Sequence, residues 1–176
     1  MGIEIEKKFL VGELPFDIES FSYHKIEQAY LNVDPAVRVR KEDDSYYMTY
    51  KASKADYDGI GKMEYNMPLD EKSYTHLLKK ADGNVITKRR YLIPINDDAY
   101  DEKYLKEHLE LSEMLDKGEI KIELDVFEGV FTGRILAEVE FPDEDSAYNY
   151  HMASWFTKEV TGDAKYSNSQ MSREKF

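Results

Sequence analysis

Hydrophobic and polar residues alternate along most of this chain. The stretch "EIEKKF" places Glu4, Glu6 and Lys8 on one face of an extended segment and mainly apolar side chains on the other. A period of two is typical of β-strands whose two faces have different surroundings. The alternation predicts strands over residues 3–10, 24–31, 36–42, 45–52, 60–68, 84–94, 119–128 and 134–142.

Turn-forming residues separate several of these strands. They include "VDP" at 33–35, "EDDS" at 42–45, and the glycines Gly59 and Gly61. Short loops of this composition join strands that are neighbours in an antiparallel sheet. We therefore expect consecutive strands to pair with each other.

Helical periodicity occupies the remaining segments. An apolar stripe runs from Asp70, the expected N-cap, to Gly83, the expected C-terminal stop. Residues 98–117 read as one acidic amphipathic helix, and a short helix begins after Asp143 or Asp145. The polar C-terminal tail is expected to hold one more helical turn. The pattern as a whole predicts the α+β class.

The polar faces of the predicted strands are almost entirely charged, with bases grouped on some strands and acids on others. A single strand of this kind usually lies at the surface with its charges in water. Strands that close into a barrel would instead direct the charges into a lumen, and about eight strands enclose room for one small ligand. Alternation alone does not decide between these two arrangements.

A barrel would bring together two chemically complementary groups of side chains. Arg and Lys suit phosphate oxygens, whereas clustered carboxylates without His or Cys suit Mg²⁺ or Mn²⁺ rather than zinc. The combination is typical of a metal–phosphate site. The candidate phosphate-binding residues are Lys8, Arg38, Arg40, Lys51, Lys88 and Arg90, and the candidate metal ligands are Glu4, Glu6, Glu64, Glu138 and Glu140.

Composition narrows the class of protein further. With 176 residues the chain is long enough for one domain, and its formal net charge of -12 argues against general nucleic-acid binding. The absence of cysteine excludes disulfides and thiolate chemistry. No apolar run approaches the roughly 20 residues of a membrane helix, and the charged N-terminus is unlike a signal peptide. We expect a cytoplasmic protein without a membrane partner.

Short motifs along nearly the whole chain resemble the CYTH superfamily, the triphosphate tunnel metalloenzymes. "EIEKKFL" at 4–10 is similar to the E-x-E-x-K signature of that family, and the tail "WFTKEVTGDAKYSNSQM" at 155–171 resembles that of its small bacterial tripolyphosphatases. Between them, in order, lie "EQAYL", "VRVR", "YYMTYK", "KMEYN", "TKRRY", "IELDVFEG" and "ILAEVEF".

The resemblance implies a fold and a set of roles. The fold is a closed antiparallel barrel of about eight strands with helices packed outside, here as a single domain over residues 1–176. The basic candidates would hold a triphosphate, and the glutamates would bind Mg²⁺ or Mn²⁺ and position the attacking water. Tyr30 matches a tyrosine that works beside the lysine matched by Lys88, so that Tyr30, Lys88 and Glu138 are the expected catalytic residues.

Two departures from the family pattern leave questions open. The usual R-x-E-x-E appears here as Lys62, Glu64 and Asn66, so that one carboxylate is lost and the number and identity of the metals are undetermined. The helical segment 98–117 looks like an insertion where relatives have a short hairpin, and its acidity fits an exterior cap or a partner surface. Two further acids, Glu123 and Asp125, can either bind metal or brace the lumen bases.

The expected function is a metal-dependent hydrolase that converts inorganic tripolyphosphate to pyrophosphate and phosphate. Three alternatives remain at this point: a thiamine or nucleoside triphosphatase, a class IV adenylate cyclase, and a non-catalytic module that binds polyphosphate or nucleotide. The expected partner is a small polyanion and not a nucleic acid. Oligomeric state, including a homodimer, is left undetermined by the sequence.

Overall fold

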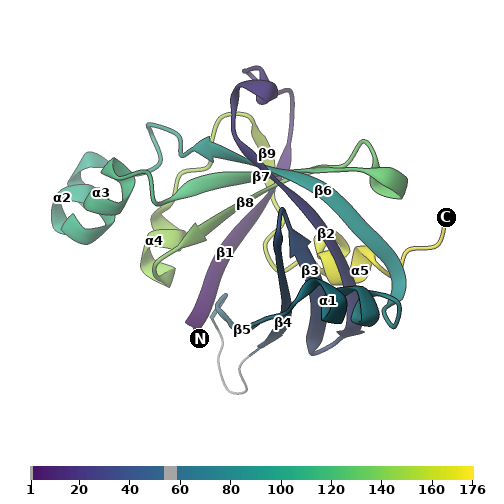
Figure 1. Cartoon of the computed structure of the whole chain (residues 1–176). Helices are drawn as coiled ribbons and strands as arrows, with labels where there is room; N and C mark the ends of the chain where they lie inside the picture. Colours follow the sequence, from purple (N-terminus) through teal and green to yellow (C-terminus); the bar gives the residue numbers. More distant parts are fainter. Residues whose placement is uncertain (1, 54–58) are drawn as a thin grey trace.

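The strands of the computed structural model form one antiparallel sheet that closes on itself (Figure 1). The structure describes residues 2–53 and 59–176. Its strand order is β5-β4-β3-β2-β6-β7-β8-β1-β9, with an additional pairing between β5 and β1. The strands are β1 (Gly2–Val11), β2 (Tyr23–Val33), β3 (Ala36–Glu42), β4 (Ser45–Ser53), β5 (Lys62–Pro68), β6 (Asp82–Pro94), β7 (Lys121–Phe127), β8 (Ile135–Phe141) and β9 (Phe156–Glu159).

The pairing of β1 with β5 closes an eight-stranded barrel. Gly2, Ile3 and Glu4 of β1 lie opposite Glu64, Met63 and Lys62 of β5. Beyond this point β1 pairs with β8 along residues 5–10, and its C-terminal end also pairs with β9. The expected fold class, α+β with a closed antiparallel barrel and helices outside, is therefore confirmed.

Each of the eight expected strands is present, with ends that differ by no more than two residues. The ninth strand, β9, was not predicted from the sequence. Its four residues, "FTKE", carry too little periodicity to be recognised, and it exists because its backbone pairs with Phe9, Leu10 and Val11 of β1. Short edge strands of this kind depend on their neighbour more than on their own sequence.

Helix α1 (Glu71–Leu78) begins as expected, with the Asp70 carboxylate accepting a hydrogen bond of 2.6 Å from the Ser73 backbone N–H. The expectation that Gly83 ends this helix is wrong. Gly83 belongs to β6 and has a φ of +78°, and a Cβ at this position would lie 2.2 Å from the Ser172 carbonyl oxygen. Glycine is required there because the C-terminal segment passes against the β6 backbone.

The expected single helix over 98–117 is also wrong, because two helices occupy this segment: α2 (Glu102–Glu107) and α3 (Leu109–Asp116). His108 separates them with a non-helical conformation, and its ring stacks on Tyr104 with the centroids 3.9 Å apart. In Figure 1, α2 and α3 stand together at one side of the molecule, away from β4 and β5.

The remaining helices are short. Helix α4 (Glu144–Asn149) is capped by Asp143 and not by Asp145, since the Asp143 carboxylate accepts from the Ser146 N–H at 2.7 Å. The tail holds the expected helical turn as α5 (Asn168–Met171). No helix in residues 2–53 and 59–176 is long and apolar enough to cross a membrane. The described residues also form three 3-10 turns: η1 (Ile18–Ser20), η2 (Gly129–Phe131) and η3 (Ala164–Tyr166).

Two apolar clusters stabilise the barrel, and their positions determine which part of the lumen stays open. The larger lies on the outer faces of the strands, where residues such as Phe9, Leu124 and Val139 are buried. The smaller cluster includes Ile86 and Phe127, which by alternation share the lumen face with the charged residues of their strands. The lumen thus becomes apolar and filled toward α5, and its charged part remains available for a ligand.

Candidate active site

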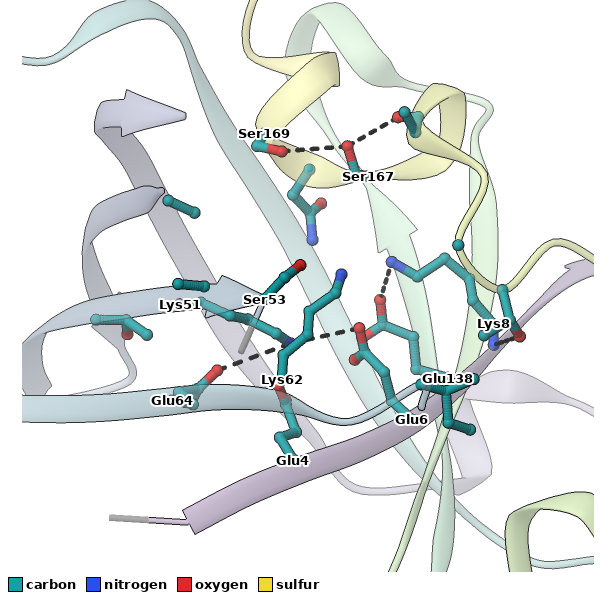
Figure 2. Close-up of a pocket in the computed structure, with 18 of the residues that line it drawn as sticks. Glu4, Glu6, Lys8, Lys51, Ser53, Lys62, Glu64, Glu138, Ser167 and Ser169 are labelled. Atoms are coloured by element: carbon teal, nitrogen blue, oxygen red, sulfur yellow. Dashed lines mark hydrogen bonds and ion pairs between the residues drawn. The ribbon is translucent and has the colours of Figure 1, made fainter. Parts of the chain in front are cut away.

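A cavity of about 620 Å³ occupies the charged part of the lumen (Figure 2). Side chains reach it from β1, β2, β3, β4, β5, β6 and β8, and the C-terminal segment forms one of its walls. Every residue proposed from the sequence for catalysis, phosphate binding or metal binding borders it, with the exception of Lys88. Those that border it are Glu4, Glu6, Lys8, Tyr30, Arg38, Arg40, Lys51, Glu64, Arg90, Glu138 and Glu140.

The lumen lysines are held by carboxylates from neighbouring strands. Lys8 Nζ lies 2.7 Å from Glu138 Oε1, and Lys51 contacts Glu4 and lies 3.4 Å from Glu6 (Figure 2). Burial alone would lower the pKa of each lysine, but the adjacent glutamates outweigh it and raise the pKa of both. Both lysines therefore remain cationic at neutral pH, as phosphate binding requires.

Arg90 is the centre of a buried ionic network. Its guanidinium donates to Asp125 at 2.7 and 2.8 Å and also contacts Glu123 and Glu138. Asp125 is completely buried and bridges Arg90 to Lys88. Of the two roles considered for Asp125, this geometry gives it the bracing role, because its carboxylate is engaged by two cations behind the cavity wall.

Lys88 is fully buried with its ammonium against Asp125, so it stands behind the cavity and not on its surface. Burial, with a smaller effect from Arg90, lowers the pKa of Lys88 to about 8. Tyr30 is 3 % exposed and does border the cavity. In this structure the expected Tyr30 and Lys88 pair is thus divided between the cavity surface and the layer beneath it.

The closest hydrogen-bond partners of Arg40 are neutral side chains. Its Nε donates to Gln28 Oε1 at 3.0 Å, and its NH1 donates to the Tyr47 hydroxyl at 3.1 Å. Glu42 is the carboxylate paired with it, at 3.6 Å. Gln28 is completely buried and fixes the Arg40 guanidinium without adding a negative charge.

The glutamates have the chemistry of a hard divalent-cation site. Glu140 is open to the lumen, yet the surrounding protein and the Glu123 and Glu4 carboxylates raise its pKa to about 8. Glu64 Oε2 is buried without a hydrogen-bond partner among the described residues. Crowded carboxylate oxygens fit Mg²⁺, Mn²⁺ or Ca²⁺. Within residues 2–53 and 59–176, however, no three acidic or His side chains converge on one point, because lysines and arginines stand between them.

The C-terminal segment contributes cavity residues that were not proposed from the sequence. Thr161, Ser167, Asn168 and Ser169 border the cavity opposite the charged strands, and Figure 2 shows Ser167 and Ser169 on the helical turns above Lys62. The sequence signals were the resemblance of the tail at 155–171 to that of small bacterial tripolyphosphatases and the run of hydroxyl and amide side chains in "YSNSQM". Such runs are common in loops, so the signal does not indicate a ligand site without the tertiary structure.

A second cavity of about 440 Å³ adjoins the first and shares Arg90 and Glu140 with it. His24, Glu42 and Lys121 border it. The charged part of the lumen is therefore bordered by two adjoining cavities. Neither is bordered by any residue of 98–117.

This is a closed antiparallel barrel with both cationic side chains and glutamates in its lumen. Such a barrel belongs to the class of binding domains that hold a polyanion together with a cation. Residues 2–159 match the CYTH domain. The chain is 31 % identical to the inorganic triphosphatase of Nitrosomonas europaea, covering 96 % of this chain and 95 % of the relative. It is 28 % identical to the inorganic triphosphatase of Acetivibrio thermocellus, covering 97 % and 94 %.

The fold agrees with this match. A crystal structure of an inorganic triphosphatase superposes with a TM-score of 0.63 at 28 % identity, over 99 % of this chain and 97 % of that one. The chain belongs to the CYTH family. The enzymes of this family that hydrolyse triphosphates are metal-dependent.

Proposed function

We propose that this protein is a metal-dependent triphosphatase that hydrolyses inorganic tripolyphosphate to pyrophosphate and phosphate. The observation that carries the proposal is that Lys8, Arg38, Arg40 and Lys51 border the same 620 Å³ cavity as the family's glutamates. The two curated relatives, both inorganic triphosphatases, support the choice of substrate.

The roles of the residues follow from their charge and position. Arg38 and Arg40 present forked donors that match phosphate oxygens, and Lys8 and Lys51 add point charges from β1 and β4. Each of these cations is already paired with a carboxylate. When the substrate binds, its phosphate oxygens take the place of those carboxylates. Binding in this preorganised field favours the charge that develops on the departing pyrophosphate.

The glutamates would hold the divalent cation, which we propose is Mg²⁺ or Mn²⁺. When bound, the cation neutralises phosphate charge and supports in-line attack by water. The residues that would hold it are Glu4, Glu6, Glu64, Glu138 and Glu140. We further propose that Tyr30 orients the reacting phosphate, and that Lys88, buried beneath the cavity wall against Asp125, supports the charged residues that border the cavity.

The proposal is tested by measuring phosphate release on four substrates side by side: tripolyphosphate, thiamine triphosphate, ATP and pyrophosphate, each with Mg²⁺ and with Mn²⁺. Tripolyphosphate should give the highest kcat/KM, and chelation of the metal should abolish turnover. Higher kcat/KM on thiamine triphosphate or ATP would reassign the substrate. Formation of cyclic AMP from ATP would identify a cyclase, and tight tripolyphosphate binding without turnover would identify a binding module.

Gln28 should matter for activity although it does not touch the cavity. Gln28→Leu removes the neutral acceptor of the Arg40 Nε, and a hydrogen bond to a charged group contributes about 1.5–3 kcal/mol. We expect kcat/KM for tripolyphosphate to fall about tenfold to a hundredfold. Tyr47→Phe, which removes the other neutral partner, should act in the same direction. Wild-type kinetics in Gln28→Leu would show that Arg40 needs no such support.

A further inference from the structure

Thr49, Asn66 and Glu64 form a hydrogen-bonded chain across β4 and β5. Thr49 and Asn66 are opposite each other in the sheet register, as are Lys51 and Glu64. The Thr49 hydroxyl donates to Asn66 Oδ1 at 2.6 Å, and Asn66 Nδ2 donates to Glu64 Oε1 at 2.9 Å. An ionised carboxylate can only accept hydrogen bonds, so the amide nitrogen of Asn66 faces Glu64, and the Thr49 hydroxyl anchors the amide oxygen on the other side.

This chain makes the two carboxylate oxygens of Glu64 unequal. Oε1 is engaged by the Asn66 amide. Oε2 is buried, has no hydrogen-bond partner in the described part of the chain, and lies 3.8 Å from both Arg38 NH2 and Lys51 Nζ. Figure 2 shows Glu64 on the cavity wall, with a dashed line that joins its carboxylate to Lys51. Oε1 is thus held by a hydrogen bond, while Oε2 faces the lumen with only the longer ionic contacts to Arg38 and Lys51.

Asn66 itself does not border the cavity formed by the described residues, whereas Glu64 and Thr49 do. Any effect of Asn66 on a bound cation must therefore pass through Glu64. A carboxylate at position 66 would place a second negative charge beside Glu64 Oε1 and would have no hydrogen to donate to it. The amide therefore supports Glu64 in a way that an acidic residue cannot.

We propose that Asn66, oriented by Thr49, is a positioning residue that holds Glu64 so that Oε2 serves as a single-oxygen ligand for a divalent cation. This inference rests on the proposed function, in which Glu64 is one of the cation ligands. It assigns to this chain a neutral supporting group at the position where the family pattern has a further acid. Groups that orient a metal ligand typically change metal affinity about tenfold to a hundredfold when they are removed.

The test is Mn²⁺ binding by the full chain without any triphosphate, measured by isothermal titration calorimetry and by electron paramagnetic resonance. Asn66→Ala should weaken Mn²⁺ binding about tenfold or more. Thr49→Val should weaken it in the same direction, whereas Thr49→Ser keeps the hydroxyl and should retain wild-type affinity. Because Thr49 acts through Asn66, the double variant should bind no more weakly than Asn66→Ala alone.

Tyr65→Phe is the matched control, since Tyr65 lies next to Asn66 on β5 with its side chain on the outer face. It should bind Mn²⁺ as the wild type does. Wild-type affinity in Asn66→Ala, additive losses in the double variant, or an equal loss in Thr49→Ser and Thr49→Val would each overturn the inference. The expected affinities in a protein that releases no phosphate would leave the inference standing and would refute only the proposed function.

Discussion

Glu138→Gln is expected to reduce phosphate release from tripolyphosphate by about a hundredfold or more, in keeping with the loss of a preorganised charged group from an active site. The substitution keeps the shape of the side chain and removes its charge. Glu138 lies 2.7 Å from Lys8 and also contacts Arg90, and its exposed fraction is 5 %. Without the shared carboxylate the two cations repel each other, and a proposed cation ligand is lost.

The measurement is steady-state kinetics on protein whose folding has been verified by circular dichroism. Glu138→Asp keeps the charge on a shorter side chain and should retain more activity than Glu138→Gln. Glu128→Gln is the matched control, because Glu128 pairs with Arg89 at 2.9 Å outside the lumen. Activity near the wild-type value in Glu138→Gln would contradict the assignment of Glu138 to the site.

Asp125→Asn should have the largest effect on stability. Asp125 is completely buried and is the shared anion of Lys88 and Arg90. Removal of one member of a buried ionic network leaves the others uncompensated, which costs about 3–5 kcal/mol of unfolding free energy. Urea denaturation at neutral pH measures this loss. Glu113→Gln, on the exposed face of α3 beside Lys117, is the control and should leave the urea midpoint unchanged.

We also expect the effect of Asp125→Asn on folding stability to depend on pH. Although burial acts in the opposite direction, Arg90 and Lys88 hold the pKa of Asp125 below its usual value of 3.8. A carboxyl group with a lowered pKa stabilises the folded state above the unfolded pKa, and this contribution is lost as the pH falls through the folded pKa. The stability difference between wild type and Asp125→Asn should therefore be greatest at neutral pH and should shrink below pH 3.8. A difference independent of pH would contradict the ionic role.

Local patterns in the sequence accounted for most of the elements. Alternation identified all eight barrel strands because each strand separates two different environments, so that every second residue has the same polar or apolar character. Asp70 identified one helix start, and the choice of Asp143 or Asp145 located a second, because a cap acts on the backbone two or three residues away. Interactions of this range depend on neighbouring residues alone.

Features that depend on distant residues were not determined in this way. Gly83 has its conformation because Ser172 passes against it, and β9 exists because β1 is beside it. Gln28 and the cavity residues of the C-terminal segment resemble ordinary polar positions until the residues that face them are known. Each of these roles arises from a contact between segments that lie far apart along the chain.

By itself, the sequence determined which residues share a face of each strand, and so which charges act together. A period of two is the same whether that face meets water or a lumen. Alternation therefore could not decide whether the charged faces point outward or into a lumen. The decision came from the closure of β1 on β5, which encloses the charged faces and leaves the apolar faces to pack outside. Closure also placed Lys88 and Asp125 beneath the cavity wall and Glu138 at its surface, because depth within a barrel is a property of the assembled sheet.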